Sequence, residues 1–356
     1  MHCSIRLRLI VVVAISASLY SARGFGETAF PPSRDADWTL TRLPDVDQQN
    51  LPTYSYFGSA NQSYFDSNDL QPTSKAFAGY QAAAALKIAK PSFSFDPSMI
   101  TIRGNDLSLK TFAWRYAPSV RMTLAKELSS GIETGIEFWK FGASARDSLA
   151  ADAGSFLISR PVPTATSGLL ASGPASMDAN AEFGVYSVDA LAGIRSRLLM
   201  LDSHFGAGIR YAETSHSYHA STGTDRVMAT QNTNGIGPLF FVNFRYRLRD
   251  NLSLVLNNQT AFLIGDYSYQ VVQTTNAGTE YARNSDNVLM QTLQSQIGID
   301  WTVESPAGIV FFQATWDIQE WYDSMRNSTG ILGAQTGLLA HNLSFGGLAI
   351  SAGITR

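Results

Sequence analysis

The sequence predicts an all-β protein: a transmembrane, antiparallel, up-and-down β-barrel of about 10 strands, preceded by a polar N-terminal extension. Three observations predict this fold. Long segments alternate apolar and polar residues, short and long connections alternate between these segments, and the N-terminus has the features of an export signal. Strands that run up and down through a membrane need short turns on one side only, and the other side is free to carry longer loops.

Residues 1–24 have the features of a cleaved signal peptide. Arg6 and Arg8 form a positive region, residues 9–20 are largely apolar, and residues 22–24 include small residues at the usual cleavage spacing. The apolar region holds about a dozen residues, fewer than the ~20 that a spanning helix needs. We therefore expect this segment to be removed from the mature chain.

Residues 25–74 are polar and rich in proline, and they show no sustained period of 2 or 3.6. We interpret them as a periplasmic or luminal segment, with a plain linker as the simpler possibility. Residues 75–356 then form the barrel. Cys3, the only cysteine, lies in the expected signal, which excludes disulfides and thiolate metal sites from the mature chain. The net charge of -3 argues against a nucleic-acid partner.

Ten segments after residue 75 alternate apolar and polar residues, an even number as in single-chain bacterial barrels. They are 77–89, 109–126, 132–144, 183–199, 204–218, 237–248, 251–267, 287–303, 308–322 and 342–354. In segment 237–248, Phe240 and Phe244 share one face, and Asn243 and Arg245 share the other. A soluble β-sandwich alternates in the same way. The membrane barrel is favoured because aromatic residues gather near the ends of the apolar faces and the segments exceed the usual ~5–6 residues.

The connections divide into two sets. We expect short turns at 128–131, 201–203, 249–250 and 304–308, and long loops at 146–181, 220–235, 269–286 and 324–340.

Three places fit the strand pattern less simply. The alanine-rich segment 80–86 is also compatible with a helix. Pro118 lacks an N–H for the ladder and needs a bulge or a strand end. The apolar face changes parity at Gly346 and Gly347, where we expect a β-bulge.

Several strand phrases occur in an order that resembles a known family. They are residues 186–195, 206–212, 235–238 and 343–348. The order resembles the Legionella-type major outer membrane protein family of pore-forming outer-membrane β-barrels, over about residues 76–356. The resemblance implies an integral outer-membrane protein that forms a pore, with no cofactor and no catalytic residue to carry over. The chain departs from the common pattern at its end, where Arg356 replaces the aromatic residue that insertion machinery reads.

Side-chain parity predicts which charged residues face the lumen. The candidates for lining a pore are Arg115, Arg121, Glu133, Glu137, Asp189, Arg195, Arg197, Arg210, Arg245, Arg247, Asp300 and Asp317. A charge that faces hydrocarbon at mid-depth costs roughly 2–4 kcal/mol, so the lumen is its natural place. These charges either line a wet pore or pair with one another as a core that fills the barrel. A ten-stranded lumen is of intermediate width, and the narrow pore is favoured, partly on the resemblance.

The sequence offers little sign of enzyme chemistry. His216 and His219 are three residues apart, on opposite faces of a strand, so we expect no metal site there. No phosphate-binding loop, nucleophile elbow or HExxH motif occurs. A hydrolase that uses His216 with Ser215 or Asp225 at the rim is the most remote alternative. We therefore expect no catalytic residue, no metal and no cofactor.

The expected function is passive passage of small hydrophilic solutes or ions through a barrel in the bacterial outer membrane. The alternative is a closed structural barrel that presents surface loops and transports nothing. The expected partners are outer-membrane lipids, the solutes and the barrel-insertion machinery, with no nucleic acid. The sequence leaves the oligomeric state open.

Overall fold

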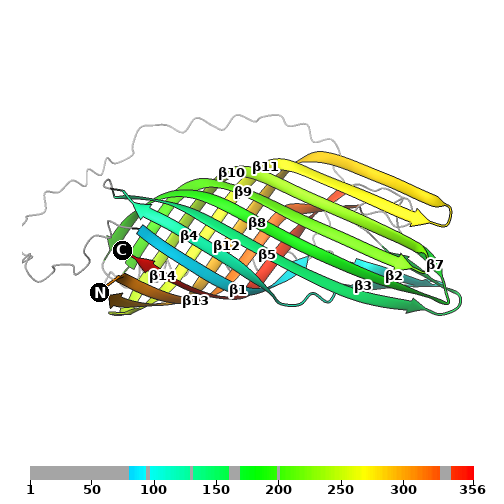
Figure 1. The fold of residues 1–356 in the computed structure, drawn as a ribbon, viewed down its shortest axis with the longest axis horizontal. Helices are drawn as coiled ribbons and strands as arrows, with labels where there is room; N and C mark the ends of the chain where they lie inside the picture. The colour runs from blue at the N-terminus through cyan, green and yellow to red at the C-terminus, as the bar shows by residue number, and fades with distance from the viewer. Residues whose placement is uncertain (1–79, 94–96, 129–130, 160–168, 199–200, 329–337) are drawn as a thin grey trace, which may run out of the picture. The chain divides into compact units, whose positions relative to one another are not determined.

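Ten strands form a closed antiparallel barrel in the computed structural model, which describes residues 80–93, 97–128, 131–159, 169–198, 201–328 and 338–356 (Figure 1). The barrel strands are β1 (Tyr80–Phe93), β4 (Ala117–Glu127), β5 (Ile132–Ala151), β8 (Ala175–Leu198), β9 (Leu201–Thr222), β10 (Asp225–Arg249), β11 (Leu252–Thr275), β12 (Gly278–Ser305), β13 (Gly308–Ser328) and β14 (Leu338–Thr355). The barrel closes because β1 pairs with both β14 and β4. The predicted fold class and strand number are confirmed. The expectations for residues 1–24 and 25–74 lie outside the described residues.

Both ends of the barrel chain lie at one end of the barrel, together with the connections β4–β5, β8–β9, β10–β11 and β12–β13; this end is here called the terminal end (Figure 1). The expected short turns at 249–250 and 304–308 are confirmed, since β10 ends at Arg249 before β11, and β12 ends at Ser305 before β13. Gly131 follows β4 with a φ of 77°, which residues with a Cβ rarely adopt. The opposite end, with the long hairpins, is the distal end. No helix among the described residues is long and apolar enough to cross a membrane.

The expected long loops at 220–235 and 269–286 are wrong. β9 runs to Thr222 and β10 starts at Asp225, and β11 runs to Thr275 and β12 starts at Gly278, so each connection is a two-residue turn. These segments are rich in polar residues and therefore resemble loops in sequence. Their alternation continues, however, with small and apolar side chains such as Val227 and Val271 buried on the inward face.

The expected long loop at 146–181 is also largely strand, because β5 runs to Ala151 and β8 starts at Ala175, and because two connections between barrel strands build a second sheet. Its order is β3 (Asp106–Thr111), β2 (Pro97–Arg103), β6 (Ser155–Ser159) and β7 (Leu170–Ser172). β2 pairs with β6, so the β1–β4 connection meets the β5–β8 connection. Met99 and Leu157 of this sheet belong to one buried cluster with Met177 of β8.

The observed strand boundaries test the remaining predictions for strands and loops. The predicted strand 109–126 divides into the end of β3 and the whole run of β4 up to residue 126. Pro118 is the second residue of β4, so its missing N–H lies at a strand end, as expected. The alanine-rich segment 80–86 is strand and not helix. The expected loop 324–340 is reduced because β13 reaches Ser328 and β14 starts at Leu338; residues 329–337 are outside the described part.

The polarity of the two faces of the wall inverts along the barrel. On β14, Leu348 and Ile350 point outward and are 49% and 59% exposed, whereas Leu343 and Phe345 point inward and are fully buried. The register stays continuous through Gly346 and Gly347 with both β1 and β13, so the expected bulge there is wrong. The apolar residues change face because the wall carries apolar side chains on its outward face in the terminal part of the barrel and on its inward face in the distal part.

The outward apolar residues mark a band around the terminal part of the barrel. Its distal limit, the band edge, follows Ile88, Phe138, Tyr186, Tyr211, Ile236, Ile264, Leu289, Ile318 and Leu348. Beyond it the outward positions turn polar, for example Asn234 and Asn232 on β10 and Asp266 on β11. A band of this kind is the lipid-facing surface of a transmembrane barrel, and the polar outward wall beyond it is typical of a sheet in water.

Phe345→Ala tests the inverted distal core. Phe345 contacts the rings of Phe141 and Phe183 at centroid distances of 4.9 and 5.8 Å, so its loss should leave a cavity and cost about 3–5 kcal/mol. Hydrogen exchange of distal β5, β8 and β14 amides should accelerate. The control is Phe312→Ala, since Phe312 points outward within the band and is 46% exposed. An equal effect of both variants would contradict the inversion.

Candidate functional site

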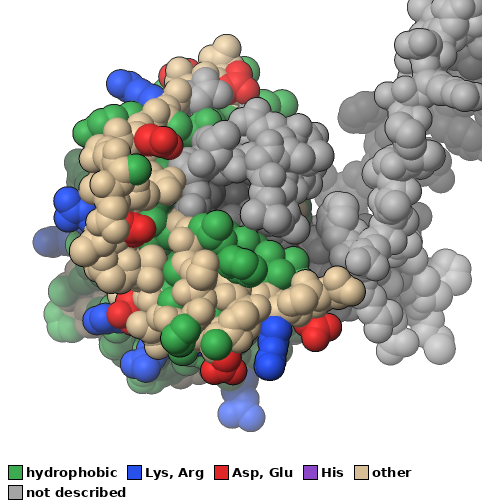
Figure 2. All heavy atoms as spheres, turned by 90° about the vertical axis from the view of Figure 1, so that its right-hand side faces the viewer, with side chains coloured by type: hydrophobic (Ala, Val, Ile, Leu, Met, Phe, Trp, Pro, Cys, Tyr) green, Lys and Arg blue, Asp and Glu red, His purple; other side chains and the backbone are tan. Residues whose placement is uncertain are grey.

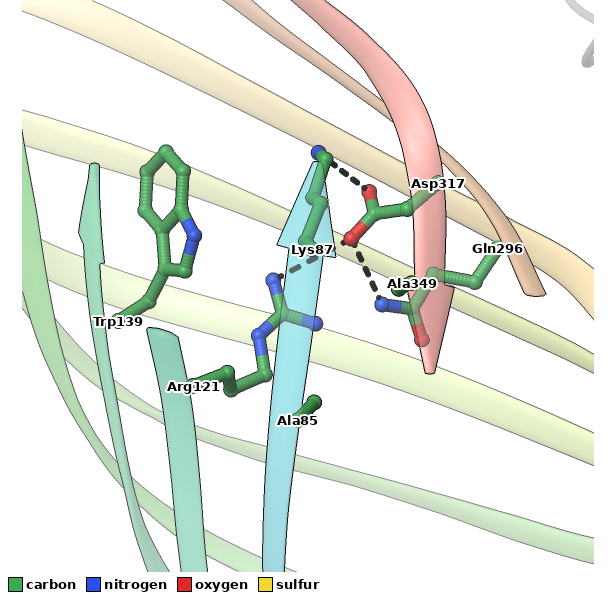
Figure 3. A pocket seen from close by; sticks show the side chains of 7 residues that line it. All are labelled: Ala85, Lys87, Arg121, Trp139, Gln296, Asp317 and Ala349. Carbon is green, nitrogen blue, oxygen red and sulfur yellow. Dashed lines mark hydrogen bonds and ion pairs between the residues drawn. The ribbon is translucent and has the colours of Figure 1, made fainter. Parts of the chain in front are cut away.

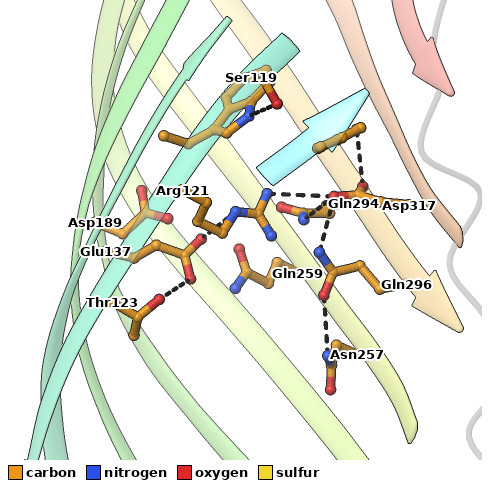
Figure 4. Close-up of polar contacts among 12 residues, drawn as sticks. Ser119, Arg121, Thr123, Glu137, Asp189, Asn257, Gln259, Gln294, Gln296 and Asp317 are labelled. Atoms are coloured by element: carbon orange, nitrogen blue, oxygen red, sulfur yellow. Dashed lines mark hydrogen bonds and ion pairs between the residues drawn. The ribbon is translucent and has the colours of Figure 1, made fainter. Parts of the chain in front are cut away.

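The lumen at the level of the outward apolar band contains a cluster of charged and polar side chains (Figure 4). Six charged residues form what we call the luminal network: Lys87, Arg121, Glu137, Asp189, Arg210 and Asp317. They come from β1, β4, β5, β8, β9 and β13, and each occupies an inward position of its strand. The three cations balance the three carboxylates, so the network is neutral as a whole.

Arg210 joins strands on both sides of the lumen. Its Nε and Nη2 donate to the two carboxylate oxygens of Asp189 at 2.8 and 2.6 Å, and the two residues are directly opposite in register. Its Nη1 donates to Thr292 Oγ1 at 2.9 Å, and Nη2 donates to Gln259 Oε1 at 2.9 Å. The guanidinium thus links β8 and β9 with β11 and β12 through charge-assisted hydrogen bonds.

Arg121 is shared between two carboxylates. Its Nε lies 3.4 Å from Glu137 Oε1 on the neighbouring strand β5, and its Nη2 lies 3.7 Å from Asp317 Oδ2 on β13. Since β1 and β14 separate β4 from β13 in the wall, the second contact reaches over two strands.

Asp317 interacts with most of the remaining donor side chains near the network. Lys87 Nζ lies 3.2 Å from its Oδ1, and the side-chain amides of Gln294 and Gln296 donate to its Oδ2 at 3.2 and 2.9 Å. Asn257 donates in turn to Gln296 Oε1 at 3.0 Å. Oδ2 of this almost fully buried carboxylate thus accepts two hydrogen bonds, whereas Oδ1 has only the ion pair with Lys87 and no hydrogen bond.

A small cavity lies beside these groups, between Lys87, Arg121, Trp139 and Asp317 (Figure 3). Its volume is about 10 Å³, roughly the space of one water molecule. The cavity is therefore far smaller than a passage for a hydrated ion.

Aromatic side chains fill the lumen beyond the network. We call this group the aromatic cap; its members are Phe93, Phe112, Trp114, Trp139, Phe141, Phe183, Tyr218, Trp321 and Phe345. Its rings form a connected series, from Trp321 on β13 through Trp139 on β5 to Tyr218 on β9. Figure 2 looks onto the distal end, where charged side chains lie around the rim and hydrophobic ones lie both at the rim and towards the middle.

The sequence-predicted candidates fall into three groups. Arg121, Glu137, Asp189, Arg210 and Asp317 come together in the luminal network.

Two further pairs lie nearer the terminal end: Arg195 pairs with Glu133, and Arg245 Nη2 lies 3.3 Å from Asp300 Oδ2. The role of these paired residues in lining a pore stays a prediction.

The third group does not join these clusters. Arg115 lies in the connection 112–116, outside the barrel strands, and its side chain is exposed, so the inward parity assigned to it is wrong. Arg247 is an exposed residue near the terminal end of β10. The side chain of Arg197 lies outside what the structure describes.

The alternation of side chains along the strands did not identify several residues that line the lumen. Lys87 was overlooked because it lies in the alanine-rich segment, where it is the only charged residue between positions 80 and 89. Gln259, Thr292 and Gln294 are neutral, so the pattern of charged inward residues does not include them, although parity places Gln259 on the polar face of its strand. The aromatic cap had one sequence signal, the parity change at Gly346 and Gly347.

His216 is the one histidine of the described residues that contacts the aromatic cap. Its ring lies 5.9 Å from that of Phe93 and 6.4 Å from those of Trp114 and Phe183, and its buried Nε2 has no hydrogen-bond partner. It lies beyond Tyr211, hence outside the lipid-facing band. Burial among apolar rings lowers the pKa of His216 to about 4. Within the described residues, no group of three or more His, Cys, Asp or Glu is placed to hold a metal ion.

Lowering the pH should destabilise the aromatic cap because His216 becomes protonated. The unfolded imidazole titrates near its ordinary pKa of 6.5 and the folded one near 4, so the opened state binds more protons between these values. The stabilisation is present above pH 6.5 and is lost as the pH falls towards 4. Hydrogen exchange of distal amides should accelerate over this range, and His216→Phe should abolish the dependence. His219→Phe, on the outward face, is the control; unchanged pH dependence in His216→Phe would refute this role.

Arg210→Met tests the buried ion pair. The variant leaves the buried Asp189 carboxylate without its main partner. It should therefore lower the free energy of unfolding by about 3–5 kcal/mol. Arg210→Met combined with Asp189→Asn should recover much of this loss, since no charge is left unpaired. Urea titrations of the refolded barrel measure both values. A single variant as stable as the wild type would show that water already solvates this part of the lumen.

The comparisons with known proteins agree with this geometry. The family model described as "Legionella pneumophila major outer membrane protein precursor" matches residues 70–355. A search among curated proteins gave no match.

Solved structures that resemble the chain include the outer membrane protease OmpT from Escherichia coli, at 11% identity and a TM-score of 0.46, covering 79% of this chain and 98% of that one. A major outer membrane protein from Thermus thermophilus shares 12% identity at a TM-score of 0.31, covering 77% and 98%. At these TM-scores the structural resemblances carry no functional argument, and the assignment rests on the family model and the barrel itself. The chain belongs to the Legionella-type major outer membrane protein family, and it is an outer-membrane β-barrel.

Proposed function

We propose that the protein is a narrow, gated pore for small hydrophilic solutes or ions, and that the structure represents its closed state. The observation that carries the proposal is the contrast between the two levels of the lumen. Distally the chain fills the lumen with aromatic side chains, whereas at the lipid-facing level it places six charges and several amides there. The sequence thus has the means to fill a lumen with apolar groups, yet within the membrane it places these charges beside inward apolar residues such as Leu239, Phe241 and Leu263.

Energetics support a functional role for these charges. A buried ion pair contributes little net stability compared with well-packed apolar residues, because desolvation offsets most of the attraction. A barrel that served only as an anchor would gain nothing from six buried charges. Ionisable residues inside a membrane protein typically mark pathways for ions or polar solutes.

Two layers close the pathway in this proposal. The luminal network joins opposite strands and leaves space for about one water beside Lys87. The aromatic cap closes the lumen distally, with Trp139 and Trp321 at a centroid distance of 6.0 Å. Opening requires exchange of partners in the network, for which the shared Arg121 is suited, together with displacement of cap rings.

The second candidate is the closed structural barrel that presents distal hairpins. The aromatic cap favours it, since a filled distal lumen suits a rigid support for surface turns. In both candidates we propose that the chain is not an enzyme, needs no cofactor, and has outer-membrane lipids and the insertion machinery as partners.

Conductance of the refolded chain in planar bilayers separates the two candidates. The gated pore should give brief openings whose reversal potential shifts towards anions in Asp189→Asn and towards cations in Arg210→Gln, because each variant leaves the opposite charge in the lumen. Arg226→Gln, on the outward face of distal β10, is the control and should shift nothing. Silent bilayers with protein that keeps its heat-dependent gel mobility would favour the structural barrel.

Orientation is the second prediction of the proposal. Barrels of this class carry their longer connections outside the cell, and here the longest, β1–β4 and β5–β8, lie at the distal end. An even strand number puts both ends of the barrel chain together on the other side, which is the periplasm in this proposal. A tag inserted after Ala277, in the turn between β11 and β12, should be labelled on intact cells. A tag after Ala307, in the turn between β12 and β13, should be labelled only after the membrane is permeabilised. The reverse pattern would overturn the orientation.

A further inference from the structure

Two lysines lie on the outward wall immediately beyond the band edge. Lys90 on β1 follows the outward Ile88, and Lys140 on β5 follows the outward Phe138, each at the next outward position. Both side chains are exposed, and neither forms an ion pair or a hydrogen bond with a described residue. Only β4 separates their strands in the barrel.

The neighbours of these lysines are apolar or phenolic. Lys140 lies directly opposite Val120 on β4 and Tyr186 on β8. Tyr116 precedes the first residue of β4 and is 62% exposed, close in register to Lys90 because Ala117 pairs with Ala89. The lysine stems can therefore lie on apolar wall while their ammonium groups extend beyond it.

Charge is segregated around the barrel at this level. Among the described residues, the outward positions of β1, β4 and β5 carry no carboxylate, and at this level β1 and β5 carry Lys90 and Lys140. At the next outward position beyond the band edge, β9, β11 and β13 carry Glu213, Asp266 and Glu320 instead. Tyr186 donates to Glu213 at 2.8 Å, and Tyr322 donates to Glu320, so two of these acids already have partners.

We propose that Lys90 and Lys140, with the hydroxyl group of Tyr116, bind phosphate groups of lipids in the leaflet next to the distal end. The surface is continuous with the lipid-facing band, so the groups that reach it are lipid headgroups. Free ammonium groups select the phosphate, to which they form charge-assisted hydrogen bonds. The site depends on the barrel crossing a membrane and not on whether the lumen conducts.

Lipid retention tests the site. The full mature barrel is refolded, placed in phosphatidylcholine nanodiscs with either diphosphorylated or dephosphorylated lipid A, and analysed by native mass spectrometry after detergent exchange. The wild type should retain the phosphorylated form preferentially. Lys90→Gln with Lys140→Gln should bind it about 30-fold more weakly, the equivalent of roughly 1 kcal/mol for each lysine.

The matched control is Arg226→Gln with Arg283→Gln. It removes the same charge from outward positions of β10 and β12 that lie well beyond the band edge, and it should retain lipid as the wild type does. Equal retention by the lysine variant, or equal retention of the dephosphorylated lipid, would overturn the proposal. Heat-dependent gel mobility verifies that each variant is folded.

Discussion

The change of solvent along the outside of the wall is the constraint on which the rest of this structure depends. Within the lipid-facing band, hydrocarbon covers the outward side chains. A strand can therefore place apolar residues on its outward face and does not depend on an apolar interior. Beyond the band edge water covers the same face, and the only place left to bury apolar surface is the lumen. One continuous set of strands therefore carries two opposite polarity patterns, without a break in register at Gly346 and Gly347.

The two interiors follow from this constraint. Where lipid surrounds the barrel, the lumen holds the neutral luminal network. In it Arg210 pairs with Asp189, and Asp317 accepts hydrogen bonds from Gln294 and Gln296 and forms an ion pair with Lys87. Where water surrounds it, the lumen holds the aromatic cap. His216 lies in this second interior, and its lowered pKa is a consequence of the same apolar packing. Any passage through the barrel has to open both layers, which differ in the forces that hold them.

Local periodicity was sufficient to predict the ten strands and the outward face within the band, because alternation is a property of neighbouring residues. It failed for 220–235 and 269–286, where the outward face is polar and the segments resemble loops. The sheet of β2 and β6 had no local signal, since residues 97–103 and 155–159 are far apart in the sequence and come together only when β1, β4, β5 and β8 lie side by side. Parity likewise placed Arg121 and Asp317 inward, but their contact depends on strands that are not neighbours in the wall.

Accessibility of single nitroxide labels along the outward face of β10 tests the polarity inversion most directly. Labels at Phe240 and Phe244 should be reached by dissolved oxygen and protected from a water-soluble nickel complex. Labels at Asn232 and Thr230 should show the reverse, with the change falling between Ile236 and Asn234. Lipid-type accessibility that continues through Thr230, or water-type accessibility at Phe240, would contradict the account.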